Sequence, residues 1–282
     1  MFSGKRFFVL ILTILVIWAV TAEALMDTEE GWLPQKPEWM PDISHSHSFL
    51  TKYIWRGWNL GDDPVWQMDT SVSKWGLTFD IWTNYTFDSD KSDDNGLYQE
   101  FTEVDYTVDY TINMEQLSGV SGMDFPEVIL PLSVSGGYVY YTFPNLDRDD
   151  KFFDTHEVYL GASYDCFLQP SFIWYWDVGV GKGNTDGGGD GSYFQFGLGH
   201  TFELAENGLS ATIGWTTGII DEQWTDETGW ADMVFSGEVA IPIFNYFTIT
   251  PSIAYSLILD RDTYNDDAEN EFYGGITIGF DY

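Results

Sequence analysis

Hydrophobic and polar positions alternate along most of the chain, and residues 99–113 form the longest regular stretch. In it, Val104 and Tyr106 are apolar or aromatic, whereas the neighbouring Asp105 and Thr107 are polar. A period of two is typical of a β-strand with one polar face and one apolar face. The stretch exceeds the ~5–6 residues of an ordinary strand and covers the ~9–11 residues that a tilted strand needs to cross a bilayer.

The same alternation recurs and predicts twelve strands. They are expected at residues 44–57, 65–73, 77–87, 99–113, 132–143, 153–164, 171–180, 191–203, 209–219, 229–240, 247–258 and 270–282. An even number of antiparallel strands places both ends of the chain on one side of a barrel. The pattern therefore predicts an all-β fold, a single antiparallel transmembrane β-barrel of about 12 strands.

The segments between these strands are of two kinds, which alternate strictly. Six are polar and carry 20 acidic residues, at 57–64, 88–98, 144–152, 181–191, 220–229 and 259–270. The other five carry few charges and are mostly short, at 74–76, 114–131, 165–170, 205–208 and 241–246. Long outer loops and short inner turns are the asymmetry of outer-membrane barrels. Pro251 falls inside an expected strand and cannot donate to its ladder, so we place it near the periplasmic end.

Residues 1–24 read as a secretory signal peptide. Lys5 and Arg6 precede an apolar run at residues 7–20, and a small-residue cleavage site ends at Ala24. The run is shorter than the ~20 apolar residues of a transmembrane helix. We therefore expect export through the inner membrane and a mature chain in the bacterial outer membrane.

Two segments follow the expected cleavage site. Residues 25–42 contain Pro34, Pro37 and Pro41, so we expect an irregular segment that lies in the periplasm or plugs the lumen. Residues 43–282 form the expected barrel.

The composition narrows the class of protein. With 45 acidic and 11 basic residues the formal charge is −34, which excludes nucleic acid as a partner because its phosphates are also negative. The single Cys excludes a disulfide scaffold. A soluble sandwich or barrel with an aromatic core is the alternative, but strand length, loop asymmetry and an aromatic content of 18% favour the membrane.

We expect two girdles of aromatic residues at the lipid headgroups, formed by Tyr53, Trp55, Trp58, Trp75, Trp82, Tyr85, Trp230, Tyr246, Tyr273 and Tyr282.

Two stretches resemble known proteins. The last strand, which ends in the aromatic Tyr282, is similar to the terminal assembly signal of bacterial outer-membrane barrels. The resemblance implies the barrel-assembly machinery and outer-membrane lipid as partners. Residues 52–57 and 61–64 resemble the first hairpin of the Gcw_chp-type family, a group of conserved hypothetical outer-membrane proteins of proteobacteria. That resemblance implies the location and the fold, and no substrate.

The polar faces of the expected strands define a candidate lumen. If the aromatic faces contact lipid, the residues that face inward are Lys52, Arg56, Asp69, Asp80, Glu103, Asp105, Asp109, Glu157, Asp177, Asp232 and Glu238. Acidic rings favour cations in a pore, so one hypothesis is a narrow channel or binding barrel for small solutes, cations among them. The other is that Lys52 and Arg56 pair with carboxylates and close the interior.

Two further functions stay open. One is a non-conducting barrel that serves structure or adhesion through its acidic loops. The other is a hydrolase at the outer rim, built on Asp154 and His156, which share a strand face. We assign no catalytic residue.

The sequence also predicts neither a metal site nor a cofactor. His45 and His47 share a face, but two ligands are too few for a site. The acidic stretch at residues 88–96 has Asp93 where a calcium-binding EF-hand loop needs Gly, which leaves at most a loose contact with divalent cations.

Overall fold

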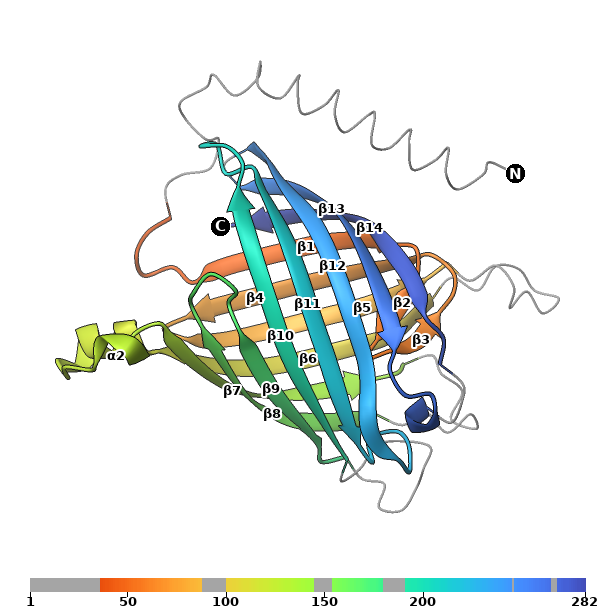
Figure 1. The fold of residues 1–282 in the computed structure, drawn as a ribbon. Coiled ribbons are helices and arrows are strands. Elements are labelled where there is room, and N and C mark those ends of the chain that lie inside the picture. The colour runs from red at the N-terminus through yellow and green to blue at the C-terminus, as the bar shows by residue number, and fades with distance from the viewer. Residues whose placement is uncertain (1–35, 88–99, 145–153, 180–190, 245, 265–267) are drawn as a thin grey trace.

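The protein forms a closed barrel of twelve antiparallel strands, which confirms the predicted architecture (Figure 1). The computed structural model describes residues 36–87, 100–144, 154–179, 191–244, 246–264 and 268–282. The barrel strands are β1 (Asp42–Leu50), β4 (Val65–Lys74), β5 (Leu77–Thr86), β6 (Glu100–Asn113), β7 (Leu132–Thr142), β8 (Thr155–Tyr164), β9 (Ser171–Asp177), β10 (Ser192–Glu203), β11 (Ser210–Asp221), β12 (Thr228–Phe244), β13 (Phe247–Ile258) and β14 (Glu271–Asp281).

The barrel closes between its first and last strands. β1 pairs with β14 from Ser44 opposite Asp281 to Leu50 opposite Gly275, and with β4 on its other side. The Ile43 amide donates to the carbonyl of Tyr282 over 2.8 Å, so β1 begins beside the end of β14. We call this side of the barrel the terminal end and the opposite side the loop end. A closed ladder pairs the backbone groups of every strand, as a bilayer requires.

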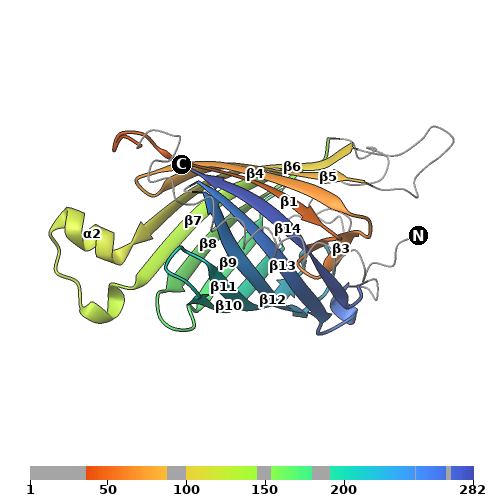
Figure 2. The ribbon, with the colours of Figure 1, turned by 90° about the horizontal axis from the view of Figure 1, so that it is seen from above.

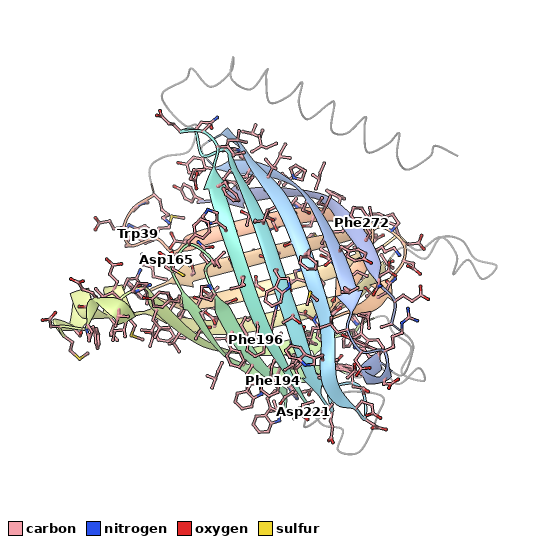
Figure 3. All side chains as sticks on the ribbon, in the orientation of Figure 1. Trp39, Asp165, Phe194, Phe196, Asp221 and Phe272 are labelled. Carbon is pink, nitrogen blue, oxygen red and sulfur yellow. The ribbon has the colours of Figure 1, made fainter. Side chains whose placement is uncertain are left out.

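Side chains alternate between the outer surface and the interior. Ile81 and Tyr106 are 47% and 46% exposed on the outside, whereas Glu103 is only 5% exposed. Figure 3 shows the labelled Phe196 and Phe272 on the outer surface of the barrel. An apolar outside and a polar inside is the arrangement of a barrel that spans a membrane.

Short turns join the strands at the terminal end, with one exception. The connection after β6 contains α2 (Met114–Ser121) and the 3-10 helix η1 (Glu127–Ile129), and it projects beyond the strand ends (Figures 1 and 2). Asn113 caps α2 by accepting hydrogen bonds from the amides of residues 115 and 116. Of the helices in the described residues, none has the length and apolarity that membrane spanning by a helix requires.

Pro251 lies in β13, near the terminal end as expected. The ladder between β12 and β13 skips from Glu238 opposite Ser252 to Ile241 opposite Ile249, so the proline falls within an interruption. Its missing donor therefore leaves the flanking pairs intact.

The first predicted strand, residues 44–57, is wrong in its second half. β1 ends at Leu50, and β2 (Tyr53–Trp55) and β3 (Trp58–Gly61) form a separate two-stranded hairpin. Arg56 and Gly57 have φ values of 48° and 83° and make its tight turn. Positive φ at both central residues is the geometry of a two-residue hairpin turn. Gly57 is also required by space, because a Cβ there would lie 2.3 Å from the Tyr264 hydroxyl oxygen.

Several predictions lie wholly or mostly outside the described residues. They are the signal peptide at 1–24, the segment at 25–42, the acidic stretch at 88–96, and the expected polar loops at 88–98, 144–152 and 181–191.

Candidate functional site

Residues 51–64, which we call the inner hairpin, fold into the barrel lumen from the loop end. The Tyr53 hydroxyl donates to Glu103 on β6 over 2.9 Å, and the Trp55 ring lies 6.2 Å from the ring of Tyr141 on β7. The next residue, Arg56, reaches Glu157 on β8. One short hairpin can contact the inward faces of three successive strands only from inside the barrel. The β1–β4 connection therefore fills part of the lumen instead of lying outside it.

Arg56, at the tip of the inner hairpin, forms a bidentate ion pair with Glu157. Nη1 donates to Oε1 over 2.6 Å and Nη2 to Oε2 over 2.8 Å. Gln223 bridges the pair, because its amide oxygen accepts from Arg56 and its nitrogen donates to Glu157. The Tyr141 hydroxyl donates to Glu157 over 2.8 Å. The parallel bonds fix the guanidinium plane, and Gln223 and Tyr141 add hydrogen bonds to the pair.

Aromatic rings enclose the same guanidinium. The Arg56 Cζ atom lies 4.4 Å, 4.2 Å and 4.7 Å from the ring centres of Trp55, Tyr175 and Tyr193, within range of cation–π attraction. Burial is the largest single effect and would lower the pKa of Arg56, but the charge and hydrogen bonds of Glu157, together with the nearby Tyr141 and Tyr175, raise that pKa overall. Arg56 therefore remains a cation inside the barrel.

A second anchor holds the base of the inner hairpin. The Lys52 ammonium donates to Glu271 over 2.6 Å and to Asp62 over 2.8 Å, and Asn59 donates to the same two carboxylates. The hydrogen bond from Lys52 lowers the pKa of Asp62. Burial by itself would lower the pKa of Lys52, but its hydrogen bonds to the two carboxylates raise it. The hairpin is thus held by ion pairs at both its tip and its base.

A cavity of about 550 Å³ lies between the inner hairpin and the barrel wall. Its lining is aromatic and polar, and includes Tyr53, Trp55, Trp82, Asp105, Thr107, Tyr141, Tyr159, Tyr175, Gln195 and Tyr273. The Tyr159 hydroxyl reaches Asp109 on β6 and donates to its carboxylate over 2.6 Å. The Tyr159 ring passes over Gly137 on β7, where a Cβ would lie 2.4 Å from the ring. A glycine on the inward face therefore makes room for this tyrosine.

The structure places the other predicted site residues as follows. Asp177 accepts from the Thr155 hydroxyl over 2.8 Å, and Asp232 accepts from the Tyr193 hydroxyl over 2.7 Å; both carboxylates are buried. Asp69 stands opposite Trp82 and Asp80 opposite Thr107 in their ladders.

Glu238 is exposed on β12 and stands opposite Thr212 and Ser252. The site brings together Arg56 and Glu157, with Glu103 and Asp105 nearby, whereas Glu238 lies apart from the cavity.

Two expectations about these residues are wrong. Lys52 and Arg56 do not lie in a barrel strand, because β1 has already ended. Several aromatic residues predicted for the lipid girdles belong instead to the inner hairpin or line the cavity, namely Tyr53, Trp55, Trp58, Trp82 and Tyr273. Trp75 and Trp230 are 87% and 53% exposed. Aromatic residues are useful on either face of a barrel, so their position near a strand end does not decide the face.

The histidines lie near the outer surface. His45 and His47 share a face, as expected, with Nε2 atoms 2.9 Å apart, and their other nitrogens face Thr70 and Trp66. Among the described residues no group of three or more His, Cys, Asp or Glu side chains could hold a metal ion.

Asp154 and His156, the two residues suggested for a hydrolase at the outer rim, each contact a tyrosine hydroxyl. His156 Nδ1 lies 2.6 Å from the Tyr138 hydroxyl, and Asp154 accepts from the Tyr140 hydroxyl over 3.1 Å.

Sequence reasoning missed the residues that complete the site. Gln223 comes from the β11–β12 loop, and Tyr264, in the 3-10 helix η3 (Asp262–Tyr264), donates to the Arg56 carbonyl. No local pattern marks loop residues that return to the lumen. The hairpin itself had a signal, since the Arg56-Gly57 turn lies between two Trp residues that pair across it.

Comparison with known structures shows the same fold in an outer-membrane channel. The COG4313 outer membrane channel from Pseudomonas putida F1 aligns with a TM-score of 0.52 at 12% identity, over 91% of this chain and 100% of that one. The KdgM porin aligns at 0.46 with 9% identity and the NanC porin at 0.47 with 14%, each over 85% of this chain and 98% of its own. The alignment with the COG4313 channel shows that the two proteins share a β-barrel fold.

No protein-family model and no curated protein matches the chain. The resemblance to the Gcw_chp-type family consequently stays a prediction.

Proposed function

We propose that this protein is a narrow outer-membrane channel for small solutes, with the inner hairpin as its constriction. The single observation that carries the proposal is the bidentate pair between Arg56 and Glu157, which fixes the hairpin tip across the lumen. A loop with no role in permeation could lie outside the barrel, where water would solvate both charges. Burying the pair has a large desolvation cost, which is offset here by five hydrogen bonds and three aromatic rings.

Solute preference follows from the charges that remain in the lumen. Both basic residues of the inner hairpin are neutralised by carboxylates, whereas several inward carboxyl groups lie on the strands. Rings of Asp and Glu select cations at short range. The proposed channel therefore prefers cations over anions.

The runner-up is a barrel that does not conduct. The same features support it, because the loop end holds a packed apolar cluster beside the hairpin, with Tyr193, Ile220 and Tyr264 each at most 2% exposed. The two functions differ only in whether a path for water and ions passes the hairpin.

Planar-bilayer recording of the purified, refolded protein separates them. We expect small, discrete, cation-selective steps for the wild type, and larger or longer openings for Arg56→Ala, because the hairpin tip loses its anchor. Lys74→Ala is the matched control, since Lys74 is also basic but contacts backbone carbonyls at the terminal end. Silence from both folded wild type and folded Arg56→Ala would overturn the channel and favour the structural barrel.

A further inference from the structure

One carboxylate oxygen at the lumen cavity lacks a hydrogen-bond partner among the described residues. Asp105 is 9% exposed and lines the cavity, yet its Oδ1 atom receives no hydrogen bond from any described residue. A buried carboxylate oxygen without a donor is costly, so such a group in a cavity wall indicates a place for a donor that comes from outside the chain.

The neighbouring carboxylates are satisfied by the inner hairpin. Glu103 accepts from the Tyr53 hydroxyl, and Glu157 accepts from Arg56, three residues farther along the hairpin. Both basic groups in the cavity wall are also engaged, Arg56 with Glu157 and Lys52 with Glu271. The described part of the chain therefore supplies no cation for Asp105, because Arg56 and Lys52 are already paired with other carboxylates.

Aromatic side chains flank the unpaired group. In the ladders of the wall, Asp105 stands directly opposite Trp82 on β5 and Tyr141 on β7, so the three side chains share one inward row. Tyr53 of the hairpin is near enough for the charge of Asp105 to act on its hydroxyl. A carboxylate between aromatic rings suits an organic cation, because the rings attract positive charge while the carboxylate accepts its N–H groups.

We infer that this cavity binds a small organic ammonium ion, whose N–H groups are accepted by Asp105 and whose carbon skeleton packs against Trp82 and Tyr141. The inference deepens the proposed channel and rests on it for its biological purpose, while the binding itself is measured without transport. A divalent metal ion fits less well, because Ca²⁺ takes six to eight oxygen ligands, whereas no group of three or more His, Cys, Asp or Glu side chains in the described part of the chain could hold a metal ion.

The size of the cavity sets the scale of the ligand. At about 550 Å³ it falls within the range of ordinary small-molecule sites. A primary ammonium group on an aromatic or aliphatic chain of several carbons would fit within it and satisfy the free oxygen.

Isothermal titration of the folded protein in detergent tests the inference with a matched pair of probes. 2-Phenylethylamine carries the ammonium group, and 2-phenylethanol has a hydroxyl in its place at nearly the same size. We expect saturable binding of the amine, and weaker binding of the alcohol by about tenfold or more, the usual effect of losing a charge-assisted hydrogen bond.

Two variants locate the site. Asp105→Asn keeps the shape of the side chain and removes its charge, and should weaken amine binding by about tenfold or more. Glu238→Gln makes the same change of charge on a strand away from the cavity, and should leave amine binding unchanged. Folding of each variant is checked by the mobility shift of unheated barrel in a denaturing gel.

Three outcomes would overturn the inference: no saturable binding of the amine to folded wild type, equal binding of the alcohol, or undiminished binding to folded Asp105→Asn. These outcomes leave the channel untouched if bilayer steps are still recorded. Conversely, amine binding in a barrel that never conducts would end the channel proposal and keep the binding site.

Discussion

At the scale of single residues, the interior depends on pairing between the inner hairpin and the barrel wall. Arg56 and Glu157 have side chains that are 8% and 1% exposed, so neither charge has water as a substitute partner. Removing one member of a buried ion pair strongly destabilises a protein, because the other charge is left buried without a partner. Removing both members can cost much less stability.

Replacing Arg56 with Met should therefore destabilise the barrel by about 3–5 kcal/mol, because the buried carboxylate of Glu157 is left without its cation. The measurement is urea-induced unfolding in lipid vesicles, followed by tryptophan fluorescence. The double variant Arg56→Met with Glu157→Gln should lose less than the sum of the two single losses. Additive losses would show that the two side chains are not energetically coupled.

At the scale of elements, the alternation of residues predicts the barrel strands, but it places the inner hairpin in the barrel wall. The alternation places β13 at residues 247–258, the bounds that the structure has, and β7 at 132–143 against Leu132–Thr142. In barrel strands the period of two arises from lipid on one face and a polar lumen on the other. Polar and aromatic residues continue to alternate at Lys52-Tyr53 and at Trp55-Arg56, because hairpin strands alternate too, although the apolar Ile54 interrupts the polar face. Periodicity therefore shows that a segment is extended, but not that it belongs to the wall.

The candidate site could be predicted only in part, for the same reason. Inward carboxylates such as Glu157 follow from the face of their own strand. The partner of Glu157 depends on where a loop goes after it leaves the wall, and Gln223 and Tyr264 come from two other loops. Such contacts are tertiary, and no local pattern of residues encodes them.

The base of the inner hairpin should respond to acid. The pKa of Asp62 is lowered in the folded protein by its hydrogen bond from Lys52, so this contact stabilises the hairpin above the ordinary carboxyl pKa of about 4 and is lost as pH falls below it. Amide hydrogen exchange at residues 58–62, corrected for intrinsic rates, should therefore be faster at pH 3 than at pH 7. Asp62→Asn should lack this contribution, and an unchanged pH response in that variant would contradict the assignment.

At the scale of the whole molecule, the closed barrel turns apolar side chains outward and carboxylates inward. Ile81 on β5 is 47% exposed on the outer surface, while Thr78 on the same strand stands opposite the inward Asp109. A cation is expensive on the lipid face of a barrel and tolerated in its lumen.

The substitution Ile81→Arg should accordingly destabilise the folded barrel in lipid by about 2–4 kcal/mol, and Thr78→Arg by much less. Equilibrium unfolding in phosphatidylcholine vesicles measures both. Equal losses for the two variants would contradict the assignment of the outer surface to lipid.

The most direct test concerns how much of the lumen the inner hairpin closes. Leu50 and Val65 are directly paired neighbours in β1 and β4, so a two-residue Asn-Gly turn can replace residues 51–64 without disturbing the wall. Single-channel conductance of this shortened protein should exceed that of the wild type severalfold in the same bilayer and salt. A folded, shortened barrel whose conductance equals the wild-type value would show that the hairpin is not the constriction.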